Sequence, residues 1–120
     1  MPRTDFTNVA FSVDDGNLIM DAQARAGHPY RHTCPLESLT AIAHAIEAAG
    51  KGGVSREDLH ERTGIAWTRI NVALVFLDER SIVERAGKRG RLVVLASRTL
   101  VEDALVEYHA LREGEAATQG

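Results

Sequence analysis

The sequence of 120 residues predicts one mainly α-helical domain with a small β-hairpin, which is an α+β fold class. Apolar residues recur at three- and four-residue spacing in several stretches after residue 35, as amphipathic helices require. Two β-prone runs flank a glycine-bounded loop at 87–90, which indicates a hairpin. Hydrophobic residues make up 44% of the chain, enough for one core and too few residues for two domains.

Residues 1–34 allow two local structures. Apolar and small side chains alternate over 9–13 as in a strand, and the turn-like 14–17 followed by an apolar run favours a hairpin. The alternative is a helix that begins at an aspartate of that turn and ends at Gly27. A strand followed by a helix is slightly favoured, with a loop over 28–34.

Three helices are predicted between residues 35 and 80. Pro35 suits the first position of a helix, whose apolar stripe continues to the glycine-rich run at 50–53. Ser55 is followed three residues later by Asp58, the capping-box arrangement of a second, two-turn helix. A third helix is predicted over 66–80, with an inward apolar face.

A hairpin and a last helix complete the predicted fold. The hairpin spans 82–95, and Thr99 with Glu102 forms a second capping-box pattern that opens a helix over 99–114. The tail over 115–120 is expected to be flexible. One face of the last helix is apolar and is predicted to be a homodimer contact, formed by Leu100, Val101, Ala104, Tyr108 and Leu111.

Charge and cysteine content narrow the class of protein. Residues 54–98 carry a net charge of +3, whereas 1–53 carry −2 and 99–120 carry −4, so only the middle segment points to an anionic partner. No apolar run approaches a membrane span, and no export signal is visible. The single cysteine fits a reducing compartment. We expect a cytoplasmic protein without a membrane partner.

Residues 35–96 resemble the winged helix-turn-helix domain of bacterial regulators of the MarR and ArsR type. The resemblance rests on the hydroxyl-capped Val54–Leu59, the Thr63-Gly64-Ile65 turn, and Leu77–Arg85, where an aliphatic pair leads into the hairpin. It implies a homodimeric transcriptional regulator of double-stranded DNA. It also divides the chain into an N-terminal extension (1–34), a winged-helix domain (35–98), the last helix and the tail.

The resemblance also implies which residues contact DNA. The third helix would enter the major groove through its N-terminal half, and the hairpin would act as a wing on phosphates. Arg69 and Asn71 have donors and acceptors that match base edges. Ser55 would offer a backbone N–H to phosphate. The implied DNA-binding residues of the third helix and the wing are Trp67, Thr68, Arg69, Asn71, Lys88, Arg89 and Arg91.

The third helix departs from that pattern on its outward face. Val72, Val75 and Phe76 lie there with Glu79, and Ala66 stands where such regulators usually carry Ser or Thr. An apolar outward face indicates that protein covers it. The N-terminal segment, the last helix, a second subunit and a foreign partner are all open at this point. The alternative function is therefore a protein-interaction module that uses this face and does not bind DNA.

Metal and catalytic chemistry are not predicted. His28, His32 and Cys34 depart from zinc-finger spacing and have no fourth ligand nearby, and flanking prolines favour a loop. The Asp14-Asp15 pair is typical of a turn. No nucleophile–base arrangement or phosphate-binding loop can be recognised. We expect no cofactor, no metal and no enzyme activity.

Overall fold

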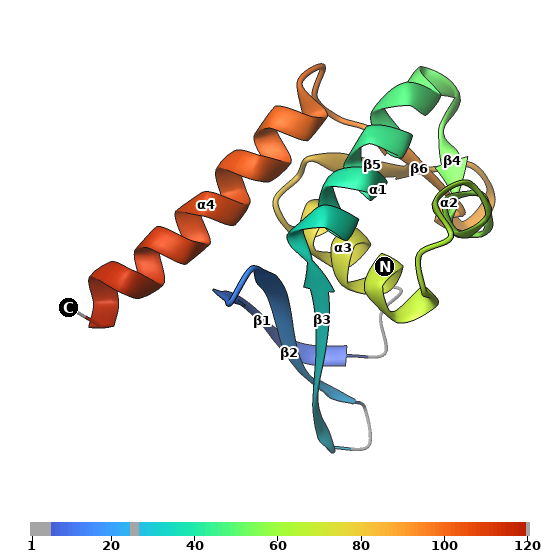
Figure 1. Cartoon of the computed structure of the whole chain (residues 1–120). Helices are drawn as coiled ribbons and strands as arrows, with labels where there is room; N and C mark the ends of the chain where they lie inside the picture. The colour runs from blue at the N-terminus through green and yellow to red at the C-terminus, as the bar shows by residue number, and fades with distance from the viewer. Residues whose placement is uncertain (1–5, 25–26, 120) are drawn as a thin grey trace.

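The computed structural model describes the backbone of residues 6–24 and 27–119, and the side chains of 9–23 and 27–114. It is an α+β fold with four α-helices and two small antiparallel sheets in this described part. The first sheet lies beneath α3, and α4 extends away from the rest of the fold (Figure 1). The fold class predicted from the sequence is confirmed at this level.

The N-terminal sheet consists of β1 (Phe6–Asp14), β2 (Asn17–Ala24) and β3 (Pro29–Pro35), paired in that order. The hairpin that the sequence allowed at its start, as the less favoured of two local structures, is present. Asp15 and Gly16 both have positive φ, 51° and 78°, and Asp14 pairs with Asn17 across them. Two successive positive φ values match the twist that a two-residue hairpin needs.

The helix and the loop predicted over the rest of this segment are wrong. The segment after the turn is β2, and residues 29–34 of the expected loop belong to β3. In β3 the more buried side chains are Tyr30, His32 and Cys34, which alternate with exposed ones, so one face of the strand packs inward. Residues 25 and 26 lie outside the described part.

The helices predicted over 35–80 are present as α1 (Leu36–Ala49), α2 (Arg56–Thr63) and α3 (Trp67–Glu79). Pro35 precedes α1 as its N-cap and is not its first helical residue. The capping box is confirmed: the amide of Asp58 donates to Ser55 Oγ (3.1 Å), and the amide of Ser55 donates to the Asp58 carboxylate (3.4 Å). A short 3-10 turn, η1 (Gly50–Gly52), follows α1.

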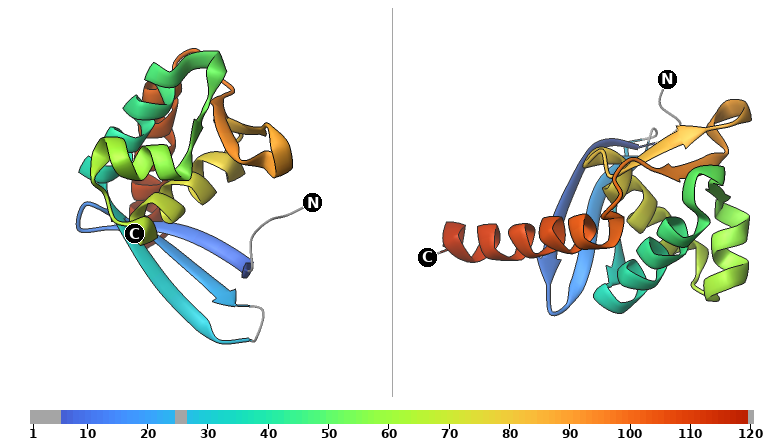
Figure 2. Two further views of the ribbon diagram at one scale, coloured as in Figure 1. Left: turned by 90° about the vertical axis from the view of Figure 1, so that its right-hand side faces the viewer. Right: turned by 90° about the horizontal axis from the view of Figure 1, so that it is seen from above.

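The predicted hairpin forms part of the second sheet. Its strands are β5 (Val83–Ala86) and β6 (Leu92–Leu95), joined by η2 (Lys88–Gly90), and β6 also pairs with β4 (Val54–Ser55). Figure 2 shows this hairpin projecting from the body of the fold beside α3.

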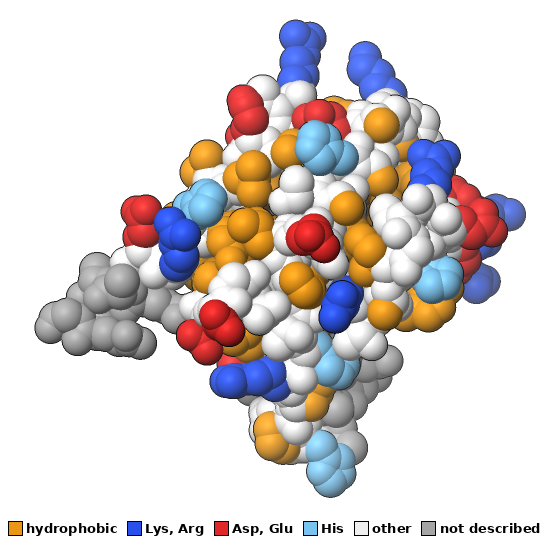
Figure 3. All heavy atoms as spheres, in the orientation of Figure 1, with side chains coloured by type: hydrophobic (Ala, Val, Ile, Leu, Met, Phe, Trp, Pro, Cys, Tyr) orange, Lys and Arg blue, Asp and Glu red, His pale blue; other side chains and the backbone are white. Residues whose placement is uncertain are grey.

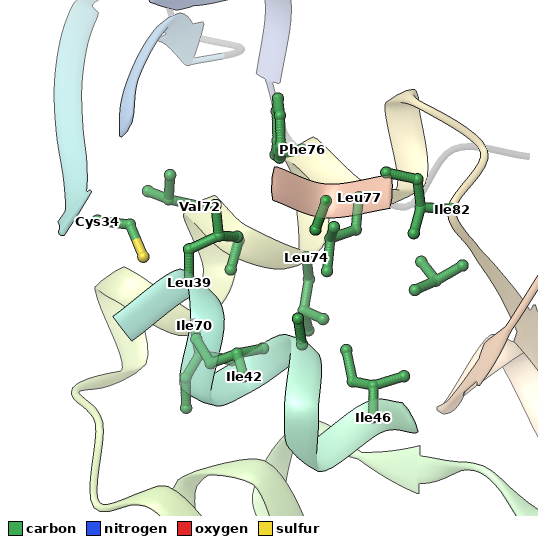
Figure 4. Packing of buried hydrophobic residues seen from close by; sticks show 14 of the residues in the cluster. Cys34, Leu39, Ile42, Ile46, Ile70, Val72, Leu74, Phe76, Leu77 and Ile82 are labelled. Atoms are coloured by element: carbon green, nitrogen blue, oxygen red, sulfur yellow. The ribbon is translucent and has the colours of Figure 1, made fainter. Parts of the chain in front are cut away.

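The core lies between α1, α3 and the two sheets. Leu39, Ile42 and Ile46 of α1 are fully buried, as are Ile70 and Leu77 of α3. Figure 4 shows the side chains of the two helices directed toward one another, with Cys34 at one margin and Ile82 at the other.

The last helix, α4 (Leu100–Gln119), packs on α1 and β1 of its own chain. Leu100, Ala104 and Tyr108 are at most 1% exposed, and Val101 and Leu111 are partly buried. The prediction that these five residues form a homodimer contact is therefore wrong for the three that are buried, because α1 and β1 already cover them. Glu47 of α1 also accepts a hydrogen bond from the amide of Val101 (3.3 Å).

The ends of α4 differ from the prediction. Asp103, and not Glu102, accepts hydrogen bonds from the hydroxyls of Ser97 and Thr99 at its start. The helix continues through Gln119, beyond the predicted end near residue 114. The predicted flexible tail is thus helical up to that residue, and residue 120 lies outside the described part.

Candidate nucleic-acid interface

The turn between α2 and α3 fixes where α3 begins. Gly64 has a left-handed conformation (φ 70°) and closes α2, while Thr63 Oγ1 donates to the carbonyl of Leu59 (2.6 Å) and accepts from the amide of Ile65 (3.1 Å). His60 Nδ1 donates to the carbonyl of Ile65 (2.8 Å). These local bonds hold the first residues of α3 in place beside α2.

The first turn of α3 (Trp67, Thr68 and Arg69) is exposed. Trp67 retains 43% of its surface, and Thr68 and Arg69 are also open to solvent. Ala66 caps the helix without a side-chain hydrogen bond, so the positive end of the helix dipole remains unneutralised there. Asn71 is half-buried, which makes it less accessible than the three residues before it.

Two residues of α2 join this turn, and the sequence did not indicate them. The His60 ring stacks on Trp67 with 4.2 Å between centroids and 18° between planes, and the Arg56 guanidinium lies 6.0 Å from the Trp67 ring. The spacing of Arg56 and His60 did contain a signal, because residues four apart on a helix lie on the same face. Arg56 adds an exposed cation to the predicted set.

The tip of the β5–β6 hairpin carries the cations that the sequence assigned to it. Lys88, Arg89 and Arg91 are all exposed. Arg89 adopts positive φ (57°), between Gly87 and Gly90, which do so as well, and this bends the chain sharply at the tip. We refer to Lys88, Arg89 and Arg91 as the hairpin cations.

Ser55 does not present the free backbone N–H that was expected of it. Its amide donates to Asp58, and its hydroxyl accepts from the amide of Asp58. The prediction that the Ser55 amide binds phosphate is wrong, because the capping box uses that donor.

The elements that carry these residues are neighbours on one side of the molecule. In the left view of Figure 2, α2 and the start of α3 face the viewer, with the hairpin beside them and the N-terminal sheet below. Figure 3 shows Lys and Arg side chains at the right-hand edge, over α2 and the hairpin, with acidic side chains among them.

The N-terminal sheet covers the remaining outward face of α3. Val72 and Phe76 are fully buried, and Val75 is partly buried against the same core. The ring of Phe11 in β1 packs edge-on against Phe76, with 5.2 Å between centroids. The surface predicted to bind a partner protein through Val72, Val75 and Phe76 is therefore wrong for the two buried residues, because the chain covers them itself.

Arg80 ties three elements together at the end of α3. Its guanidinium lies 5.1 Å from the Phe76 ring and 5.8 Å from the Phe11 ring, and it pairs with Glu107 of α4 (3.2 Å) and with Glu79. The cation–π and ionic contacts join β1, α3 and α4 where the sheet meets the helix. Arg80 therefore belongs to the packing of the sheet, not to the exposed cationic surface.

The residues weighed as metal ligands do not converge. Cys34 is buried, His32 is half-buried and His28 is exposed. In the part of the chain that the structure describes, no group of three or more His, Cys, Asp or Glu side chains is placed to hold a metal ion.

Cys34 makes a pH-dependent contribution to stability. Burial raises the pKa of its thiol to about 12, against a small lowering by Arg69, whereas an unfolded thiol titrates near ~8.5. Between these values the unfolded chain has lost the proton that the folded chain keeps, so stability falls as pH rises. We expect the stability advantage of wild type over Cys34→Ala to shrink by about 2 kcal/mol from pH ~7.5 to ~10.

Urea unfolding of both proteins at these two pH values checks this expectation. Burial also raises the pKa of Tyr108, but that group is present in both proteins and cancels in the comparison. An advantage that is independent of pH would show that the Cys34 thiol is accessible to water.

Comparisons with known proteins add no assignment: no family model, curated protein or solved structure matches the chain. Among the helices of the described residues, none has the length and apolarity needed to cross a membrane.

Proposed function

We propose that this chain is a winged-helix protein that binds double-stranded DNA and acts in transcriptional regulation. One observation carries the proposal. Five cations of the basic middle segment are exposed at the start of α2, on the first turn of α3 and at the hairpin tip, namely Arg56, Arg69, Lys88, Arg89 and Arg91. Val72 and Phe76, further along α3, are covered by the N-terminal sheet.

The chemistry of the first turn of α3 suits base edges in a major groove. Arg69 has the paired donors that recognise guanine O6 and N7, and Thr68 has a hydroxyl for phosphate and a methyl for thymine. The N-terminal sheet restricts contact to this turn, because Val72 and Phe76 lie beneath β-strands. Arg56 and the hairpin cations would bind phosphates on either side, which supplies affinity without sequence information.

The same covering disfavours the alternative, a protein-interaction module built on the apolar face of α3. That face is already occupied by Phe11 and its neighbours in the same chain. The buried part of the apolar face of α4 is likewise covered by α1 and β1. We therefore propose that a single chain binds its DNA site, without dimerisation through this face.

Replacement of Arg69 tests the proposed contact. We expect Arg69→Ala to weaken binding to a duplex by roughly tenfold, since one base-edge or phosphate contact is worth about 1–3 kcal/mol. The matched control is Arg112→Ala, which removes an exposed arginine from the distal half of α4. Fluorescence anisotropy with a labelled duplex measures both, and equal affinities for the two variants would reject Arg69 as a contact.

A further inference from the structure

Trp67 is held as a flat ring at the junction of α2 and α3. The His60 ring lies nearly parallel to it at 4.2 Å, and His60 is itself fixed by the hydrogen bond from Nδ1 to the Ile65 carbonyl. The indole is therefore oriented before any ligand arrives. A pre-oriented aromatic ring loses little side-chain entropy when it binds.

The two ring contacts of Trp67, with His60 and with Arg56, both come from α2. His60 and Arg56 are four residues apart on α2, so both approach Trp67 from that helix. Trp67 nevertheless keeps 43% of its surface exposed, and among described residues only Val106 is also a large hydrophobic residue left exposed. The exposed part of the indole is available to a flat, apolar ligand.

The charges beside the ring define what kind of flat ligand suits it. Arg56 lies 6.0 Å from the ring, and Arg69 is exposed two residues further along α3. The acids of α2 are Glu57, Asp58 and Glu61. Glu57 and Glu61 each follow Arg56 or His60 by one residue and so point about 100° away, and Asp58 is bonded to Ser55 in the capping box. An aromatic group linked to negative charge fits this arrangement, and a nucleotide has both.

We propose that Trp67 is a stacking platform for one unpaired nucleobase, with an adjoining phosphate held by Arg56. This inference rests on the proposed DNA-binding function and makes it more specific, because a base can stack on Trp67 only when it leaves the duplex stack. Aromatic side chains bind bases in this way irrespective of sequence. The base would come from a single strand or from an unpaired position within a duplex.

The test compares three labelled oligonucleotides: a fully paired duplex, the same duplex with one unpaired thymine, and single-stranded oligothymidine. Their affinities are measured for wild type, Trp67→Phe, Trp67→Leu and the control Val106→Ala. Trp67→Phe keeps an aromatic ring on which a base can stack. Trp67→Leu keeps an apolar side chain against His60 but removes the aromatic ring. Trp67 is the sole tryptophan, so quenching of its fluorescence reports stacking directly in the wild-type protein.

We expect Trp67→Leu to lose about 5- to 150-fold in affinity for the unpaired base, and Trp67→Phe to lose much less. Affinity for the fully paired duplex should fall much less than affinity for the unpaired base, because a paired base cannot stack on Trp67. The loss appears with oligothymidine, with the duplex carrying the unpaired thymine, or with both, and this identifies the source of the base.

Two results would overturn the stacking platform. Equal losses on paired and unpaired DNA would make Trp67 an ordinary groove contact, and no loss on any oligonucleotide would exclude it from the interface. The proposed function is judged separately: duplex binding that disappears when Lys88, Arg89 and Arg91 are all replaced by Ala supports it whatever Trp67 does. Absence of binding to all three oligonucleotides would reject both.

Discussion

Phe76→Ala is expected to destabilise the fold by about 3–5 kcal/mol, which is the usual cost of removing a buried aromatic ring. Phe76 is fully buried, its ring contacts Phe11 edge-on at 5.2 Å, and the Arg80 guanidinium lies 5.1 Å away. Its removal would leave a cavity between α3 and the N-terminal sheet and would weaken the contact that holds the two together. A loss of this size is a large part of the stability of a small domain.

Urea unfolding followed by circular dichroism measures the effect. The matched control is Val106→Ala, because Val106 is 63% exposed and its replacement should change stability by about 0.5 kcal/mol or less. If Phe76→Ala behaved like this control, the N-terminal sheet would not cover α3, and the apolar face would again be available to a partner protein.

Replacement of all three hairpin cations is expected to have the largest effect on DNA binding. Lys88, Arg89 and Arg91 are exposed at the tip and make no ion pair that the structure shows among its described residues, so the charges are available to phosphates. Loss of three phosphate contacts corresponds to a drop on the order of 10²- to 10³-fold at ~0.1 M salt.

The triple Ala variant should also lose most of the salt dependence, since each lost contact removes about 0.9 from the log–log slope. Anisotropy titrations at several salt concentrations measure both quantities. Thermal unfolding should be nearly unchanged, because solvent-exposed side chains at a hairpin tip contribute little to stability. An unchanged slope with unchanged affinity would place the DNA contact elsewhere on the molecule.

The elements that the sequence predicted well are those encoded by local chemistry. The Ser55–Asp58 capping box formed as expected because both partners lie within one turn of helix. The turn at Asp15 and Gly16 formed for a similar reason, since two adjacent residues supply the positive φ values. The same holds for the three helices between residues 36 and 79.

Strand β3 could not be recognised from apolar periodicity. Tyr30, His32 and Cys34 do alternate with exposed residues, but a histidine in the middle of the pattern and a proline at each end indicated a loop. The strand forms because β2 pairs with it along its whole length. That pairing is a tertiary contact and leaves no periodic signal of its own.

At the candidate interface too, a tertiary contact that leaves no periodic signal in the sequence decides which element covers α3. The sequence indicated that protein covers Val72, Val75 and Phe76, but it left four candidates for the cover open. Choosing among them depends on Phe11 meeting Phe76 and on Arg80 contacting both rings, and Phe11 and Phe76 are 65 residues apart. The apolar face of α4 was wrongly predicted to be a dimer contact for the same reason. An amphipathic pattern identifies a buried face but not the element that covers it.

The sequence also did not predict that the His60 ring stacks on Trp67. The two rings lie against one another, and Trp67 keeps 43% of its surface exposed. Their contact depends on the angle between α2 and α3, which the turn around Gly64 sets.

The most direct test of the proposed DNA-binding surface is the salt dependence of duplex binding by the wild-type chain. Anisotropy of a labelled random-sequence duplex is measured at ~50 mM and ~200 mM salt. With about four phosphate contacts, from Arg56 and the hairpin cations, we expect binding with a log–log slope near −3.6, a loss of about 150-fold over that range. No binding even at the lower salt concentration would contradict the claim that α2, the first turn of α3 and the hairpin tip form a DNA-binding surface.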